Sequence, residues 1–255
     1  MINLTETDTF AIFKMPDDNT IYFVRQFLPS DNNFKESSLK KSGFVIYPFD
    51  IESNKAIFIN ADEILIDPFF NITITKNTEL QSTTIEEYTD ISKKIIAVLD
   101  DKYYKIVHSK IKVLKNEGAD IYKLYKRLAK KNKNAFVFLF NTPETGLWMG
   151  ATPEKLLTAK NNKFETIALA GTQYINANSE VTWNEKDISE QKIVMEYLEN
   201  ILKESDIEFK KNGPYTKIAS RNENMNLVHL ATDYKFSTEK TLYNLLLKLH
   251  PTPAT

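Results

Sequence analysis

Residues 135–150 read AFVFLFNTPETGLWMG, in which two apolar runs flank a polar turn. The turn at 141–146 contains both proline and glycine, which interrupt strands, and the first run is rich in phenylalanine and valine, which favour strands. The stretch therefore predicts a β-hairpin, and with it an antiparallel sheet.

The chain before this hairpin also consists of short strand-like runs cut by turn residues. A hairpin is predicted over residues 9–27, with its turn at 16–19. The polar insert at 29–41 is predicted to be a mobile surface loop. Three further strand-like runs occupy residues 43–49, 55–60 and 63–67. The N-terminal third is thus expected to be mostly strand.

Helices enter beyond residue 75. The spacing of apolar residues predicts helices at 84–100, 120–131, 185–204 and 239–249. A capping box, Thr83-Thr84-Ile85-Glu86, marks the start of the first helix. Strands are predicted at 103–114, 163–169, 215–220 and 226–232. Strands followed by single helices, with no alternating βαβ pattern, predict an α+β fold with antiparallel β-sheets packed against helices. We expect a β-rich part at 1–90 and a second part at 91–255, interlocked as one domain.

The amino-acid composition indicates which kinds of binding partner to expect. Of 255 residues, 42% are hydrophobic, which is enough for a large core, and a net charge of -1 gives no attraction to nucleic acid or to a membrane surface. The chain has no cysteine, which excludes disulfides and thiolate chemistry and suits the cytoplasm. Six glycines leave no glycine-rich phosphate loop. We therefore expect a cytoplasmic protein with a small-molecule partner.

Lys105 is a charged residue that the alternation of apolar and polar residues predicts to face the protein interior. In the strand predicted at 103–114, period-2 alternation places it on the more apolar face, with Val107 and Ile111. A lysine that faces the interior loses hydration, which favours the neutral amine that a general base requires. The alternative is that the side chain reaches the surface or pairs structurally.

Glu190 is a second candidate. It lies one turn before Ile193 and Val194 on the apolar stripe of the predicted helix 185–204. A buried carboxylate needs a partner, a proton or a metal ion, and an oxygen ligand in a chain without cysteine favours a hard cation such as Mg²⁺. Alternatively, Glu190 is only an acidic residue near a helix N-terminus.

Two more polar residues stand next to apolar runs. Glu154 follows the turn after the hairpin, where acidic residues are commonly solvated. His229 lies in the short apolar run Leu227–Leu230, where a single histidine is more often a hydrogen-bonded core residue than a catalyst. Neither residue alone indicates a reaction.

Five segments carry a more specific pattern when they are taken in order. They are GATPEKLL at 150–157, LAGT at 169–172, NEKDISEQ at 184–191, HLAT at 229–232 and LHPTPA at 249–254. They resemble the motifs of the chorismate-binding enzymes, the family of isochorismate synthases, salicylate synthases, anthranilate synthase large subunits and aminodeoxychorismate synthases. The resemblance implies the chorismate-utilising fold, as in anthranilate synthase component I.

The same resemblance implies roles for individual residues. Lys105 matches the lysine that activates water in isochorismate synthases, and Glu154 the general acid that protonates the departing hydroxyl. Glu190 would ligate Mg²⁺. The residues implied to line the chorismate pocket are Gly171, Thr172, His229 and Ala254. Because base and acid serve opposite faces of the ring, Lys105 and Glu154 should not touch.

Two positions favour one member of the family. Aminodeoxychorismate synthases that use a covalent lysine carry it where this chain has Ala170, and anthranilate synthases usually lack the equivalent of Lys105. The resemblance therefore favours an isochorismate synthase, with menaquinone and siderophore synthesis both open as pathways. The alternatives are a salicylate synthase, an anthranilate or aminodeoxychorismate synthase, and a non-catalytic homologue.

The chain also departs from the family pattern. Ile188, Ser189 and Gln191 replace Arg, His and His of the family helix, so the surroundings of Glu190 should differ. Family members continue for roughly a hundred residues beyond the last motif, so the fold is expected to be incomplete at the C-terminus and the 255-residue chain inactive. We expect a monomer for an intact protein and self-association of the fragment through exposed strand edges.

Overall fold

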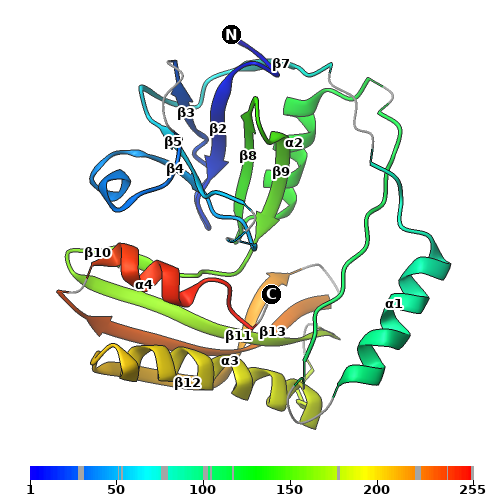
Figure 1. Ribbon diagram of the computed structural model, residues 1–255, viewed down its shortest axis with the longest axis vertical. Coiled ribbons are helices and arrows are strands. Elements are labelled where there is room, and N and C mark those ends of the chain that lie inside the picture. The colour runs from blue at the N-terminus through cyan, green and yellow to red at the C-terminus, as the bar shows by residue number, and fades with distance from the viewer. Residues whose placement is uncertain are drawn as a thin grey trace.

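A computed structural model gives the arrangement of the chain. It describes residues 1–27, 32–50, 52, 54–75, 80–99, 103, 105–116, 118–176, 179–221, 225–239 and 241–253. Its α-helices are α1 (Ile85–Val98), α2 (Ile121–Lys131), α3 (Glu185–Glu204) and α4 (Leu242–Leu249). Figure 1 shows one sheet with α2 in the upper half of the molecule, a second sheet with α3 in the lower half, and the C-terminal end of the chain between them.

The first sheet has five antiparallel strands in the order β6-β3-β2-β8-β9. Their bounds are β2 (Thr9–Lys14), β3 (Tyr22–Gln26), β6 (Glu63–Ile66), β8 (Phe136–Thr142) and β9 (Gly146–Thr152). Both predicted hairpins, 9–27 and 135–150, are confirmed, and they lie side by side because β2 pairs with β8. The division at residue 90 remains a prediction, and this sheet takes strands from both sides of it.

Both faces of this sheet are covered, which explains why residues 10–13 of its central strand β2 are all apolar. Phe10 and Ile12 of β2 pack toward α2, where Tyr125 is fully buried. Ala11 of β2 packs in the opposite direction, with Ile59 of β5. Burial of each large side chain stabilises the fold by about 1.5–3 kcal/mol. Two small sheets, β4 (Gly43–Ile46) with β5 (Ile57–Asn60) and β1 (Ile2–Thr5) with β7 (Phe70–Thr73), complete this half of the molecule.

A buried lysine fixes the end of β2. The Lys14 ammonium donates hydrogen bonds to the backbone carbonyls of Met15, Lys133 and Ala135, at 3.1, 2.8 and 3.2 Å. Burial lowers the pKa of Lys14, while Asp17 and Asp18 oppose that shift. These three bonds replace the hydration that the ammonium loses and tie β2 to the segment that leads into β8.

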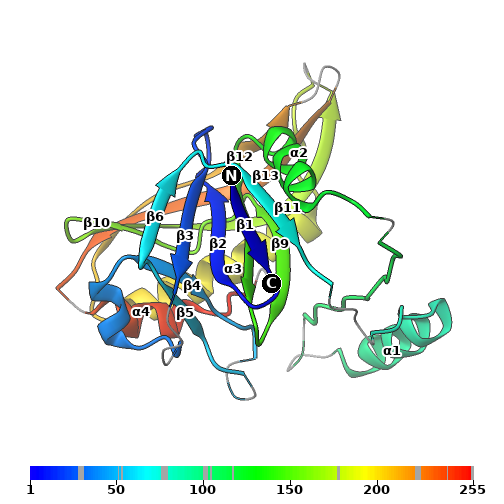
Figure 2. The ribbon, with the colours of Figure 1, turned by 90° about the horizontal axis from the view of Figure 1, so that it is seen from above.

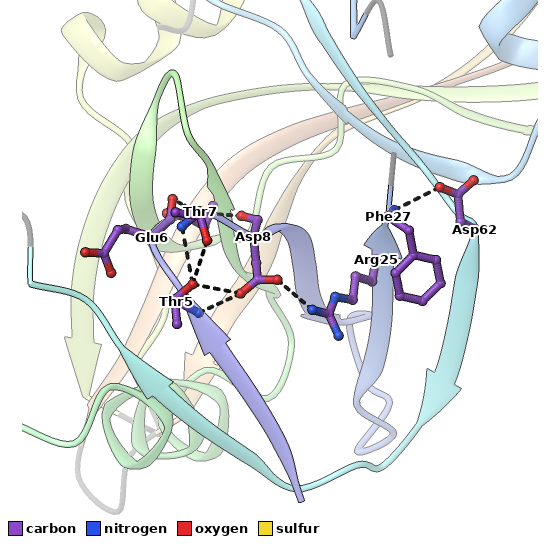
Figure 3. A network of polar contacts seen from close by, with 8 residues as sticks. Thr5, Glu6, Thr7, Asp8, Arg25, Phe27 and Asp62 are labelled. Carbon is purple, nitrogen blue, oxygen red and sulfur yellow. Dashed lines mark hydrogen bonds and ion pairs between the residues drawn. The ribbon is translucent and has the colours of Figure 1, made fainter. Parts of the chain in front are cut away.

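A polar cluster closes the other end of β2 and β3 (Figure 3). Arg25 donates to Asp8 at 2.6 Å, and its guanidinium lies 5.3 Å from the centre of the Phe27 ring. Burial acts to raise the pKa of Asp8, but hydrogen bonds from Thr5 and Arg25 outweigh it and hold that pKa below its usual value. The cluster joins the chain before β2 to β3 through a partly buried ion pair.

The second sheet carries the motif segments. Its four antiparallel strands lie in the order β10-β11-β13-β12, with bounds β10 (Thr158–Lys160), β11 (Lys163–Asn176), β12 (Phe209–Arg221) and β13 (Met225–Ser237). Both α3 and α4 pack on one face, where Leu198, Leu202 and Leu249 meet Phe164 and Tyr234. The helix predicted at 185–204 has these bounds in the structure, and the predicted strands are present but longer.

Helix α1 is attached differently. It stands apart from both sheets (Figure 2), and none of its residues is buried. Its cap lies one residue later than predicted, with Thr84 accepting from the backbone of Glu87. The His108 ring stacks on Tyr88 at 4.4 Å, and Ser92 lies 3.2 Å from His108 Nδ1. These contacts attach α1 to the segment that carries Lys105.

The strand predicted at 103–114 is wrong. The described residues there, 103 and 105–114, form no strand. The Ile111 N–H donates to Thr83 Oγ1, the Ile111 carbonyl accepts from the Thr83 backbone, and the Val113 N–H donates to Ser82 Oγ. Alternation in a sequence indicates which side chains share a face, but a strand also needs a neighbouring strand to receive its N–H and C=O groups. The described part of the chain supplies no such neighbour here.

The insert at 29–41 also differs from its prediction. Part of it is an ordered 3₁₀ helix, Glu36–Lys40, with Ser38 accepting from the backbone of Lys35, and Phe34 is buried. Residues 28–31 lie outside the described part. Within the described residues 32–41, Phe34 and Ser38 are buried and anchor the insert, while several of their neighbours remain exposed.

No helix in the described ranges is long and apolar enough to cross a membrane.

Candidate active site

Gly171 forms a bulge in β11. Ala170 lies opposite Leu230 and Thr172 lies opposite His229, so Gly171 has no partner of its own in β13. Its φ of 70° lies in the left-handed region, which glycine adopts without steric cost. The bulge turns Thr172 onto the face of the sheet that carries His229, and Thr172 Oγ1 lies 3.0 Å from His229 Nδ1.

The contacts of His229 assign its tautomer. Nδ1 lies 3.1 Å from the carbonyl oxygen of Gly171, and a carbonyl only accepts, so Nδ1 carries a proton. In the neutral ring, Nε2 is then an acceptor. It is buried and has no hydrogen-bond partner among the described residues. An unpaired buried acceptor is costly, and Nε2 therefore keeps a hydrogen-bonding capacity that the described residues do not satisfy.

Glu154 follows β9 and is half-buried. Its backbone N–H donates to Thr152 Oγ1 at 3.3 Å. Burial raises the pKa of its carboxyl, and the positive charge of Lys105 opposes this rise. A carboxyl that keeps its proton to higher pH is suited to act as a proton donor.

Lys105 is also half-buried, and its ammonium donates to the backbone carbonyl of Pro253. No hydrogen bond or ion pair joins it to Glu154 in the part of the chain that the structure describes, yet its charge acts on that carboxyl. Lys105 and Glu154 are thus neighbours without direct contact. Ala254, the next residue after Pro253, lies outside the described residues.

Glu190 is on the edge of the buried stripe of α3, with 31% of its side chain exposed. Its carboxylate lies 3.9 Å from the Lys186 ammonium, a surface pair that contributes about 0–1 kcal/mol. The carboxylate is therefore available to a further partner. The structure shows no contact between Glu190 and the other candidates, and no group of three or more potential metal ligands occurs in the described ranges.

Two polar residues on α3 were missed by the sequence interpretation. Asp187 and Gln191 are 7% and 2% exposed, and they precede Val194 and Leu198 on the stripe that faces the sheet. Gln191 Nε2 donates to the carbonyl of Ala168, while its Oε1 has no partner among described residues. The signal that could have identified them is the i, i+4, i+7, i+11 spacing of positions 187, 191, 194 and 198, which places all four residues on one face of the helix.

The structure thus brings the candidates together in two groups. Gly171, Thr172 and His229 share one bulge, and Lys105 and Glu154 share an electrostatic neighbourhood. Both groups stand on an antiparallel α+β scaffold, and the second sets a half-buried carboxyl beside an amine.

The chain belongs to the chorismate-binding enzyme family, whose model matches residues 52–255. The resemblance drawn from the five motifs is thereby confirmed.

Two curated proteins illustrate the similarity. Isochorismate synthase EntC of Escherichia coli strain K12 is 26% identical over 185 residues, which are 68% of this chain and 46% of EntC. Anthranilate synthase component 1 of Mycolicibacterium smegmatis is 30% identical over 103 residues, 38% of this chain and 20% of that protein. The chain spans about half the length of EntC.

Solved structures confirm the fold. DhbC of Bacillus anthracis, described as a 2,3-dihydroxybenzoate-specific isochorismate synthase, gives a TM-score of 0.68 at 17% identity, over 98% of this chain and 74% of that one. MenF, the menaquinone-specific isochorismate synthase of E. coli, gives 0.63 at 12% identity, over 98% and 70%. The predicted chorismate-utilising fold is therefore present.

Proposed function

We propose that the protein is an isochorismate synthase, which converts chorismate to isochorismate by adding water at one ring carbon and releasing hydroxyl from another. The observation that carries the proposal is the pair Lys105 and Glu154, an amine and a half-buried carboxyl that are close but not in contact. The similarity to EntC, DhbC and MenF supports the same choice.

The pair supplies the two proton transfers of this reaction. In its neutral form, Lys105 takes a proton from water as the water oxygen bonds to the ring, the ring double bonds shift, and Glu154 gives its proton to the hydroxyl that departs as water. One water enters and one leaves, so the reaction is an isomerisation. Each group would contribute about 10²–10⁴ in rate. This requires the ring to lie between the two side chains.

The bulge residues would orient the ring. The Nε2 atom of His229 accepts a hydrogen bond from a substrate hydroxyl, while the Thr172 hydroxyl and the open backbone at Gly171 approach the same ligand. Ala254, which lies outside the described residues, is also proposed as a substrate-binding residue. Among these groups, His229 Nε2 has no hydrogen-bond partner in the described residues, which supports its assignment.

Glu190 would hold Mg²⁺. A single half-exposed carboxylate fits this ion, which is commonly bound through one or two carboxylates with several waters retained. Mg²⁺ bound there would supply positive charge to a substrate carboxylate. The residues of this chain then carry out the proton transfers.

The cytoplasm is the proposed location and chorismate the proposed partner, with neither nucleic acid nor membrane. The lack of cysteine and the balanced charge support this setting. We further propose one interlocked domain, a monomeric intact protein, and a place in menaquinone or siderophore synthesis.

The test is product analysis. The product of the complete open reading frame is incubated with chorismate and Mg²⁺, and the mixture is separated by chromatography; isochorismate is the expected product. Ammonia is added in a parallel reaction, because the similarity to an anthranilate synthase makes amine addition the second candidate. Anthranilate or salicylate as the main product would overturn the proposal, as would chorismate that stays unchanged and unbound.

A further inference from the structure

Asp187 lies against the bulge that carries Gly171. It is in the first turn of α3, where its backbone N–H donates to Asn184 Oδ1 at 2.8 Å, and its side chain is buried. A Cβ added to Gly171 would lie 2.9 Å from the Asp187 Cβ. The start of α3 therefore touches β11 at the position where the strand departs from regular pairing.

Gln173 links this carboxylate to the strand. Its Nε2 donates to Asp187 Oδ2 at 2.9 Å and to the carbonyl of Thr182 at 3.3 Å. Gln173 pairs with Val228 directly after the bulge, and it faces α3 whereas Thr172 faces His229. The first residue after Thr172 is thus held on the helix side of the sheet by two hydrogen bonds.

Because adjacent residues of a strand point to opposite faces of the sheet, the face on which Gln173 lies determines the face to which Thr172 points. A bulge is one extra residue in one strand, and loss of that residue from the bulge shifts the register by one position and exchanges the two faces. In the slipped register Thr172 would face α3 and Gln173 would face His229. The contact between Asp187 and Gln173 exists only in the observed register.

We propose that Asp187 and Gln173 are positioning residues that hold the Gly171 bulge in the register that presents Thr172 and His229 to the substrate. The inference rests on the proposed function for its kinetic consequence, but its structural content does not depend on chorismate. Asp187 acts through Gln173, because it lies on the helix face of the sheet, opposite to His229.

The experiment compares Asp187→Ala with Asp187→Asn. The asparagine keeps an oxygen that accepts from Gln173 Nε2, whereas alanine removes it. The structural readout is the ¹⁵N–¹H spectrum of the imidazoles, which is simple because the chain has three histidines. His108→Gln and His250→Gln assign the His229 signals. Glu196→Ala, an exposed acidic residue on the same helix, is the matched control.

We expect Asp187→Ala to move the His229 nitrogen signals and to lower kcat/KM for chorismate by about 10–100-fold, since misplaced binding groups cost factors of this order. Asp187→Asn should restore the signals and most of the activity, and Glu196→Ala should change neither. If Asp187→Ala does not fold, Gln173→Ala tests the same contact and should also move the His229 signals.

Two results would overturn the proposal. One is an Asp187→Ala protein, folded by circular dichroism, whose His229 signals match those of the unsubstituted protein. The other is an Asp187→Asn protein as impaired as Asp187→Ala with unmoved signals, which would show that the charge itself is required. If no variant acts on chorismate, the imidazole spectra still decide the positioning role, so the two failures are distinguishable.

Discussion

Helices α1 and α3 begin alike and end up in different surroundings. Each has a side-chain cap, Thr84 for α1 and Asn184 for α3, and each has an apolar stripe. Yet α3 buries six side chains while α1 buries none. Capping and periodicity are enough to define a helix, whereas burial depends on what lies opposite.

The two groups of candidate site residues also differ in how much the surrounding structure holds them in place. Gly171, Thr172 and His229 lie on paired strands covered by α3, so the scaffold fixes their geometry. Lys105 lies on an unpaired segment beside α1, and its ammonium is tied to Pro253. The region around α3 should therefore dominate stability, while the region around α1 should matter for turnover more than for folding.

Lys105→Ala gives the sharpest test of that contrast. Loss of a general base should reduce isochorismate formation by about 10²–10⁴. The melting temperature should stay nearly unchanged, since the side chain is half-exposed and makes one backbone contact. Chromatographic rates and thermal denaturation check both parts, with Lys112→Ala, exposed on the same segment, as the control. A fully active Lys105→Ala protein would break the assignment.

Leu198→Ala tests the contribution of the region around α3 to stability. This side chain is 1% exposed between α3 and the second sheet, so its truncation should lower the free energy of unfolding by about 2–5 kcal/mol. Ile96→Ala on α1, where 68% of the residue is exposed, should cost less than about 0.5 kcal/mol. Urea denaturation measures both. Equal losses would mean that α1 is packed in solution.

Gly171→Ala addresses the bulge itself. A residue with a Cβ at positive φ costs about 1–2 kcal/mol, and this Cβ would also meet Asp187. We expect lower stability by at least that amount in urea, together with weaker chorismate binding in a thermal-shift titration. Gly118→Ala is the control, since it has a positive φ but open space around it. Similar losses in the two variants would show that the Asp187 contact adds nothing.

Glu154→Gln should change the melting temperature only slightly, in a direction that the shifted pKa of Glu154 determines. Burial raises the folded-state pKa of Glu154 above its ordinary value of 4.5, so the folded protein binds this proton more tightly than the unfolded chain does. Stability from this group falls as the pH rises from 4.5 through the raised value. Glutamine stays neutral, so the variant should melt slightly higher than the unsubstituted protein at neutral pH and match it in acid. A lower melting point at neutral pH would contradict the assigned cause.

Local patterns predicted most elements because their causes are local. The hairpin turn at 141–146 could be read directly, and α3 has its predicted bounds. The strand at 103–114 failed because pairing is not a local property. Glu190 was placed on the buried stripe, but the residues that face the sheet are Asp187 and Gln191, a phase difference that periodicity alone did not resolve.

The motifs predicted the grouping of Gly171, Thr172 and His229 better than any strand pattern did. Nothing in the letters LAGT shows that Gly171 sits in a bulge, because a bulge is visible only against the partner strand. The roles of these residues, and of Lys105, Glu154 and Glu190, remain predictions that the variants above decide.

The position of β2 at the centre of its sheet has a consequence for how the chain reaches its native state. Its hairpin partner β3 is local, but Lys14 at its end bonds to Lys133, 119 positions further along. During synthesis, the hairpin of β2 and β3 therefore keeps the edge of β2 unpaired until β8 has left the ribosome. Such long-range closure slows folding and exposes an aggregation-prone edge, so a chaperone that shields nascent strands should raise the yield of this protein.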